Sequence, residues 1–360
     1  MSMKDPAVLL GMYNGALAVA AAGVALRPKA RADLPKAISQ IPGFGFSRAD
    51  LEAAGTATLE DFPPTLFLVG APRCGTTAIS KALAGHPVIS FSKPKETHYL
   101  LEPRGEMTEG AWRALYLKRY HQGLSRQHQA TIDGSVSYLY SPEAIERALE
   151  FDPRARFMVM VRNPVDMLRS YHARMLFQLD EDVEDFAKAW ALQQSRAAGH
   201  DLPKRCRDPR LLQYGEAGQL GKHVERLFEV AGRERCLAVV FDDWVRNSRE
   251  VYLRVLDFIG LEDDGRTDFR RKRETTGFRS TWLQQFVMNP PAWALRLVAL
   301  SNTAQIKRLK GLRKRIKSFN TRDDKRPPLS EEMRDTLRRY FADDVKKLSR
   351  LLSRDLSHWS

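Results

Sequence analysis

From about residue 65 onward, apolar runs of strand length alternate with amphipathic segments of helical period. The expected strands lie within 65–72, 155–164 and 236–244, and the expected helices within 76–87, 165–179 and 248–261. Several of these helices end next to glycine or proline, as helices commonly do. Buried strands that alternate with helices predict a parallel sheet in a three-layer α/β domain.

The first part of the chain has a different pattern. Residues 8–26 carry no charged side chain, and this apolar stretch is long enough to span a bilayer. It is also rich in Ala and Gly, so a membrane anchor, a signal peptide and a helix packed on the body all stay open. If it is an anchor, the basic residues that follow it would keep the main domain cytoplasmic. We therefore expect an N-terminal extension over 1–64 and a main domain over 65–360.

Charge and cysteine content narrow the choice of partners and compartment. The net charge is +14 and the pI is about 9.8, so we expect an anionic partner: a phosphate-rich ligand, an acidic glycan, an anionic membrane or, less in keeping with the motifs below, a nucleic acid. The three cysteines, Cys74, Cys206 and Cys236, form neither a disulfide framework nor a zinc pattern. A reducing compartment, such as the cytoplasm, is the simplest interpretation.

The first chemical motif is a glycine-rich turn, GAPRCGTT, between a predicted strand and a predicted helix. Its spacing is that of a phosphate loop, although Thr76 stands where the lysine of such a loop belongs. Backbone N–H groups at a helix N-terminus attract an anion, and Arg73 adds a full charge. The residues expected to bind the anion are Arg73, Cys74, Gly75, Thr76 and Thr77.

Two other interpretations of this turn stay open. An NTPase would need the lysine and Mg²⁺, although Asp242 or Asp243 after an apolar strand imitates its second motif. The same sequence pattern would also occur at a helix N-terminus that is capped by threonine and binds no ligand.

The second motif, KPKETHYL at 93–100, places one carboxylate among cations. Glu96 is a candidate general base, since flanking lysines favour the anionic form that a base requires. Taken alone, the segment 93–100 could also be a cluster of charged residues on the surface.

The third motif, VRNPVDMLRSYH at 161–172, combines an arginine and a hydroxyl. Arg162 ends a predicted strand and Ser170 lies in the first turns of the next helix. Ligands of open α/β sheets bind at the carboxyl ends of the strands, so these two residues predict a second anion site.

As an ordered set, the motifs resemble those of the PAPS-dependent sulfotransferases, especially the heparan sulfate type and its bacterial relatives. GAPRCGTTAI is similar to the 5′-phosphosulfate loop, ETHYL to the segment of the catalytic base, and ARFMVMVRNPVDMLRSYH to the 3′-phosphate segment. DGSVSYLYSP at 133–142 and the closing segment from 325 to 359 also resemble family motifs. The likeness runs from about residue 65 to residue 359.

The resemblance implies a reaction and a set of roles. PAPS would be the co-substrate, no metal is expected, and Glu96 would take a proton as a hydroxyl or amine of a carbohydrate, lipid or glycolipid attacks the sulfur. Arg73 and His98 complete the implied catalytic set, and the 3′-phosphate would be held by Arg162, Ser170, Lys325 and Arg326. The alternatives are a P-loop-like NTPase or nucleotide kinase, and a non-catalytic binder of acidic glycans or membranes.

The chain departs from this pattern in two places. The loop lacks a lysine, and Gly134 stands where heparan-type members carry another lysine. Lys93 or Lys95 could substitute for it.

A basic insertion at about 284–322 matches no motif of the family. Its apolar residues recur at helical spacing within 305–317, between the cations Lys307, Arg308, Lys310, Arg313, Lys314, Arg315 and Lys317. A helix that covers the acceptor cleft is one interpretation. Another is a basic amphipathic helix that docks on an anionic membrane, at the cytoplasmic face of the inner membrane, and a third is a helix that binds nucleic acid.

Overall fold

The computed structural model describes residues 62–269, 276–280, 282–284, 311, 315–316, 318–323 and 328–359. These residues belong to two compact units. The sheet unit has its described residues within Ser47–Met167, Gly218–Arg273 and Arg334–Ser360, and the helical unit within Leu168–Ala217 and Glu274–Met333. The predictions for residues 8–26, for the extension up to residue 61 and for most of 305–317 lie outside the described residues.

The sheet unit contains the parallel sheet that the sequence predicts. Its strands are β1 (Thr65–Gly70), β2 (Ile89–Phe91), β3 (Ala130–Asp133), β4 (Arg156–Val161) and β5 (Cys236–Val240). They are ordered β2-β3-β1-β4-β5, and each neighbouring pair is parallel. All the carboxyl ends therefore meet at one edge, where the loops that follow the strands come together.

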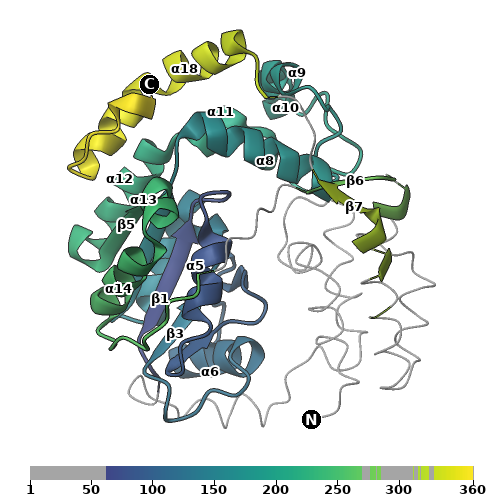
Figure 1. Cartoon of the computed structure of the whole chain (residues 1–360). Coiled ribbons are helices and arrows are strands. Elements are labelled where there is room, and N and C mark those ends of the chain that lie inside the picture. Colours follow the sequence, from purple (N-terminus) through teal and green to yellow (C-terminus); the bar gives the residue numbers. More distant parts are fainter. Residues whose placement is uncertain are drawn as a thin grey trace, which may run out of the picture. The chain divides into compact units, whose positions relative to one another are not determined.

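Helices complete the layers around this sheet. In Figure 1, α5 (Thr76–Leu83) and α14 (Ser248–Ile259) lie in front of the strands, and these two helices contact each other. A second pair, α7 (Pro142–Phe151) and α12 (Leu220–Ala231), packs together, with α12 also in contact with β4 and β5. This unit also contains α6 (Glu109–Tyr120), the short α13 (Phe241–Arg246) and most of α18 (Glu331–Leu351). The strands β1 and β4 are almost entirely apolar in sequence, because both of their faces are covered.

Two local predictions needed correction. The third predicted strand continued to residue 244, but β5 ends at Val240 and a helix begins at Phe241. The acidic pair Asp242 and Asp243 lies in the first turn of this helix, where the helix dipole favours negative charge. Asp243 also pairs with Arg354. The short strands β2 and β3 were not among the predicted elements.

The helical unit contains most of α8 (Pro164–Gln178), then α9 (Phe186–Ala191), α10 (Gln193–Ala197) and most of α11 (Tyr214–Gly218). A fully buried ion pair holds it together: Arg196 donates two hydrogen bonds to Glu181, at 2.7 and 2.8 Å, and Tyr214 donates a third at 2.6 Å. A two-stranded antiparallel sheet of β6 (Thr276–Phe278) and β7 (Thr321–Asp323) joins the two ends of the basic insertion.

Among the residues that the structure describes, no helix is both long and apolar enough to cross a membrane.

Candidate active site

The loop between β1 and α5 is built to expose backbone N–H groups. Gly75, which precedes α5, has φ of 89°, and a Cβ there would lie 2.7 Å from the ring of Phe241, so only glycine fits. The Ala71 amide donates to the Met160 carbonyl at 2.7 Å and fixes the loop to β4. The N-terminus of α5 has no side-chain cap, and the first amides of a helix have no acceptor within the helix. The loop can therefore cradle an anionic group.

A lysine from outside the loop, Lys95, reaches Thr76, which stands where a phosphate loop usually has its own lysine. The Lys95 Nζ donates to the Thr76 Oγ1 at 3.3 Å and to the Glu96 Oε1 at 3.4 Å. A Cβ at Gly134 would lie 2.8 Å from the Cγ of Lys95, so the Lys95 side chain fills the space that glycine leaves open. Of the two lysines that the sequence offered as substitutes, Lys95 is the one with this contact. Lys93 is exposed.

Glu96 has a cation on one side and an imidazole on the other. Its carboxylate is 39% exposed, which leaves it accessible to a substrate, and its Oε2 lies 3.8 Å from the His98 Nε2. The opposite ring nitrogen of His98, Nδ1, is 2.8 Å from the Ser137 hydroxyl, which fixes the ring. The arrangement suits a carboxylate that accepts a proton and an imidazole that orients it.

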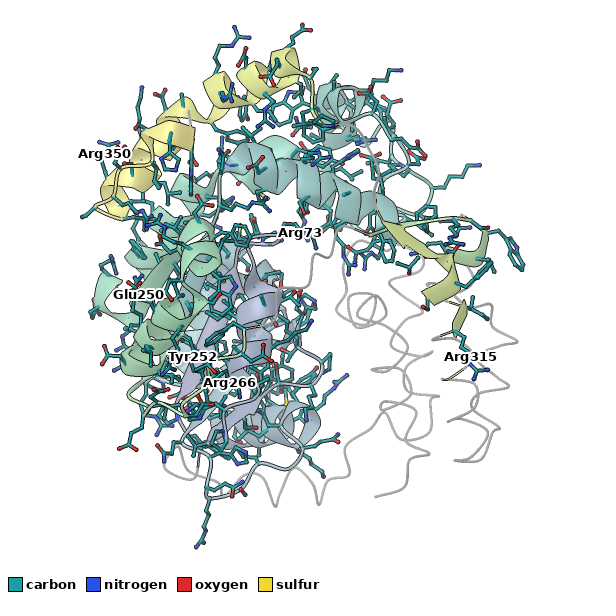
Figure 2. All side chains as sticks on the ribbon, viewed as in Figure 1. Arg73, Glu250, Tyr252, Arg266, Arg315 and Arg350 are labelled. Carbon is teal, nitrogen blue, oxygen red and sulfur yellow. The ribbon has the colours of Figure 1, made fainter. Side chains whose placement is uncertain are left out.

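Two arginines approach the loop. Arg73 lies within it, with φ of 64°, and Figure 2 shows Arg73 near the carboxyl end of the sheet. Arg162, just after β4, donates from Nη1 to the Arg73 carbonyl at 3.4 Å. Its guanidinium also lies 4.7 Å from the centre of the Phe241 ring, at cation–π distance. Phe241 thus contacts both the Gly75 backbone and the Arg162 side chain.

Cys74 is fully buried, and its thiol donates to the Pro72 carbonyl at 3.6 Å. Burial raises the pKa of this thiol to about 12, although the nearby charges of Arg162 and Arg73 act in the opposite direction. Cys74 therefore serves the loop through its backbone and its packing, and its sulfur is not a nucleophile at neutral pH.

The other predicted site residues are Thr77, Ser170, Lys325 and Arg326. Thr77 is exposed in the first turn of α5. Ser170 is half-buried on α8 and belongs to the helical unit. Lys325 and Arg326 lie outside the described residues.

Sequence reasoning left out several residues of this site. From the sequence, Lys95 was a candidate only as a substitute for the lysine that heparan-type members carry at the position of Gly134. The sequence assigned no contact in the site to Phe241 or to the turn Asp133–Ser135. Gly134 was the sequence feature that could have indicated the position of Lys95, because a glycine leaves room for the side chain of a neighbouring residue. Phe241 gave no such signal, since an aromatic residue after a strand is ordinary.

The chain matches the sulfotransferase domain family over residues 63–349 and belongs to that family. It is therefore a sulfotransferase, and the family implies PAPS as the co-substrate.

Three solved structures resemble it. A sulfotransferase from Alicyclobacillus acidocaldarius is 23% identical, with a TM-score of 0.56, and the match covers 83% of this chain and 99% of that one. The sulfotransferase domain of the Synechococcus PCC 7002 olefin synthase is 16% identical, with a TM-score of 0.37 over 82% and 96% of the two chains. The sulfotransferase domain from the curacin biosynthetic pathway is also 16% identical, with a TM-score of 0.38 over 82% and 99%. The first of these supports the fold.

The buried thiols give a prediction about reactivity. Burial raises the pKa of Cys74 and Cys236 to about 12 and that of Cys206 to about 11. Because only the thiolate is nucleophilic and its fraction grows with pH, iodoacetamide at pH 8 should alkylate native Cys74 about 10²-fold or more slowly than the denatured chain. Mass spectrometry of each cysteine peptide measures this rate. Half-buried Cys206 should react before Cys74, and alkylation of native Cys74 at the denatured rate would contradict the structure.

Proposed function

We propose that the chain transfers the sulfonate group of PAPS to a hydroxyl or amine of an acceptor, with Glu96 as the general base. One observation carries this proposal: the Lys95 ammonium contacts both Thr76 of the phosphosulfate loop and Glu96. The loop for the donor and the carboxylate for the acceptor thus share one cation. This arrangement supports a direct transfer, because it holds the group for the donor close to the group for the acceptor.

The chemistry follows from these positions. Glu96 takes the proton of the acceptor as its oxygen or nitrogen forms a bond to sulfur, while the bond from sulfur to the bridging phosphate oxygen breaks. The products are the sulfated acceptor and PAP, and the proton stays on Glu96 until solvent takes it. Lys95, Arg73 and the amides at the start of α5 stabilise negative charge on the donor side. His98 holds the carboxylate toward the acceptor.

The 3′-phosphate of PAPS distinguishes it from ATP-like nucleotides. Arg162 is suited to this group because its guanidinium is already placed against Phe241 and beside the loop. We assign Ser170, Lys325 and Arg326 to the same phosphate on the resemblance of their segments to the family motifs.

For the acceptor we propose a carbohydrate, lipid or glycolipid, and for the enzyme the heparan-type subtype. The Glu-x-His segment, in which His98 contacts Glu96, supports this subtype. Labelled PAPS offered with sugar, lipid, phenol and amine acceptors would identify the class.

Glu96→Gln tests the base. The glutamine is nearly isosteric but accepts no proton, so we expect turnover of PAPS to fall by about 10²- to 10⁴-fold. Affinity for PAP, measured by calorimetry, should stay within about threefold, because Glu96 acts on the acceptor and Lys95 keeps its contact with Thr76. The assay follows PAP release with an unsulfated heparan-type oligosaccharide and with water as acceptors. Wild-type turnover in this variant would remove Glu96 from the role.

Lys95→Met tests the shared cation. Methionine keeps much of the side-chain volume that packs on Gly134 but removes the charge, so we expect turnover to fall by about 10²- to 10³-fold. Lys93→Met is the matched control, because Lys93 is exposed and its change should leave turnover near wild type. Equal losses in the two variants would mean that general positive charge matters and that the contact of Lys95 does not.

The same chain carries a surface suited to an anionic membrane. The two most exposed large apolar side chains among the described residues are Trp282 at 69%, shortly after β6 in the chain, and Phe319 at 66%, shortly before β7. The Arg279 guanidinium lies 5.5 Å from the centre of the Phe319 ring, and Arg315 is exposed (Figure 2). Exposed aromatic rings with nearby cations are typical of surfaces that bind at the membrane interface.

Buried amides fix this surface. Asn320 is fully buried, accepts from the Ser280 amide at 2.8 Å and donates to the Gln284 side chain at 3.3 Å. Gln284 in turn donates to the Phe177 carbonyl of α8 at 2.7 Å.

From these exposed rings and the nearby cations, we propose that Trp282 and Phe319 dock the enzyme on an anionic leaflet. Three free cysteines support a reducing compartment, so we place this leaflet on the cytoplasmic face of the inner membrane.

Vesicle co-sedimentation tests the docking. Wild type should sediment with vesicles of phosphatidylglycerol and phosphatidylcholine at low salt, and much less with phosphatidylcholine alone. Changing Trp282 and Phe319 together to Gln should weaken binding by about tenfold or more per ring, since burying such a side chain contributes about 1.5–3 kcal/mol. Tyr340→Gln, which removes an aromatic ring that is 52% exposed on α18, is the control. Binding that survives the double change would contradict the docking.

A further inference from the structure

A buried carboxylate lies behind the segment that carries Glu96. Asp133 ends β3 and is fully buried, in the same unit as Glu96. Its Oδ1 accepts from the Ser135 amide at 2.9 Å and the Ser135 hydroxyl at 2.6 Å. Its Oδ2 accepts from the hydroxyls of Thr97 at 2.6 Å, Tyr116 at 3.0 Å and Tyr138 at 3.2 Å. Both oxygens are thus saturated with donors.

The donors around Asp133 in turn hold the Glu96 segment, residues 95–100. The amides of Thr97 and His98 donate to the Ser135 Oγ at 2.9 and 3.0 Å. The Tyr99 amide donates to the Thr97 Oγ1 at 3.2 Å, and the Leu100 amide donates to the Tyr138 hydroxyl at 3.1 Å. Four consecutive backbone amides therefore end on side-chain oxygens that are bonded to one carboxylate.

Lys95 is held from the same turn. The Gly134 amide donates to the Lys95 carbonyl at 3.1 Å, and the Ser92 hydroxyl donates to it at 2.9 Å. The backbone on both sides of Glu96 is therefore attached to residues 133–138. Glu96 itself lies between these attachments and makes no bond to Asp133.

Such external support is needed because the segment has little regular structure of its own. Only its last two residues belong to a helical element, the 3-10 turn η2 (Tyr99–Leu101), and His98 has φ of 54°, in the left-handed region. A residue other than glycine stays in that region only when its surroundings hold it there. A catalytic group misplaced by about 1 Å can cost about 10²-fold in rate.

We infer that Asp133 is the positioning residue of this active site: through Thr97, Ser135 and Tyr138 it fixes the backbone that carries Lys95, Glu96 and His98. The inference rests on the proposed role of Glu96 but assigns a separate function to a residue that touches no substrate.

Thr97 offers the cleanest pair of variants. Thr97→Val keeps the shape but removes the hydroxyl that donates to Asp133 and accepts from Tyr99, whereas Thr97→Ser keeps that hydroxyl. We expect Thr97→Val to lower PAPS turnover by about 10- to 10²-fold while PAP affinity stays within about threefold, and Thr97→Ser to stay within about threefold of wild type. Turnover is measured as PAP release with the same oligosaccharide and with water.

Hydrogen exchange gives a readout that needs no acceptor. Exchange of the amides at 97–100 should accelerate by about tenfold or more in Thr97→Val and in Asp133→Asn, because the opening of this segment becomes easier. Asp152→Asn is the matched control. Asp152 is another buried carboxylate of the same unit, 2% exposed, that accepts from the Thr65 amide at 2.9 Å, at the amino end of β1. Its change should lower stability without altering turnover or exchange at 97–100.

The double variant of Glu96→Gln with Thr97→Val separates positioning from general damage. If Thr97 acts through the Glu96 segment, the second change should cost clearly less in the Glu96→Gln variant than in wild type, because the positioning of Glu96 no longer contributes and only that of Lys95 and His98 is left. Unchanged exchange and turnover in Thr97→Val would overturn the inference, as would a full extra loss in the double variant. Wild-type turnover in Glu96→Gln alone would instead overturn the proposed base, while faster exchange in Thr97→Val would still support the anchoring by Asp133.

Discussion

The active site depends on how closely the segments after β1 and β3 approach each other. The two strands are parallel neighbours, with Phe67 opposite Asp133, so the loop after β1 and the turn after β3 leave the same edge of the sheet. Gly70 permits this approach, and Gly134 permits that of the Glu96 segment, which follows β2. A Cβ at Gly70 would lie 2.6 Å from the Leu139 side chain, and one at Gly134 would lie 2.8 Å from Lys95. Lys95 passes through the space at Gly134 and reaches Thr76, which joins the loop to the Glu96 segment.

The fold and the loop could be predicted from the sequence because their signals are local. Apolar runs before Gly70 and Arg162 predicted strands that the structure contains, and the glycine spacing predicted the turn before α5. The support of the site could not be predicted in the same way. Asp133 and Thr97 lie 36 positions apart in the chain, and their contact depends on the pairing of β3 with β2, the strand that precedes Thr97. One sequence contains no local pattern for such a contact.

The two carboxylates near the site differ in their environment, and this difference separates their roles. Asp133 is fully buried; burial raises its pKa, while hydrogen bonds from Ser135, Thr97 and Tyr116 oppose that rise. With five donors on its two oxygens, it has no free lone pair directed to a substrate. Glu96 is partly exposed and has one ammonium at hydrogen-bonding distance. A saturated, buried acid suits a structural anchor, and an accessible one suits proton transfer.

The absence of a lysine from the loop now has a physical explanation. In an NTPase the loop lysine and Mg²⁺ neutralise the phosphates, and the attacking water is oriented by other residues. Here Thr76 takes the place of that lysine and accepts a hydrogen bond from Lys95, which lies next to Glu96 in the chain. The cation therefore comes from the segment that also carries the proposed base. Any movement of that segment would displace both groups at once, so a single anchor at Asp133 can control the charge on the donor side and the proton transfer on the acceptor side.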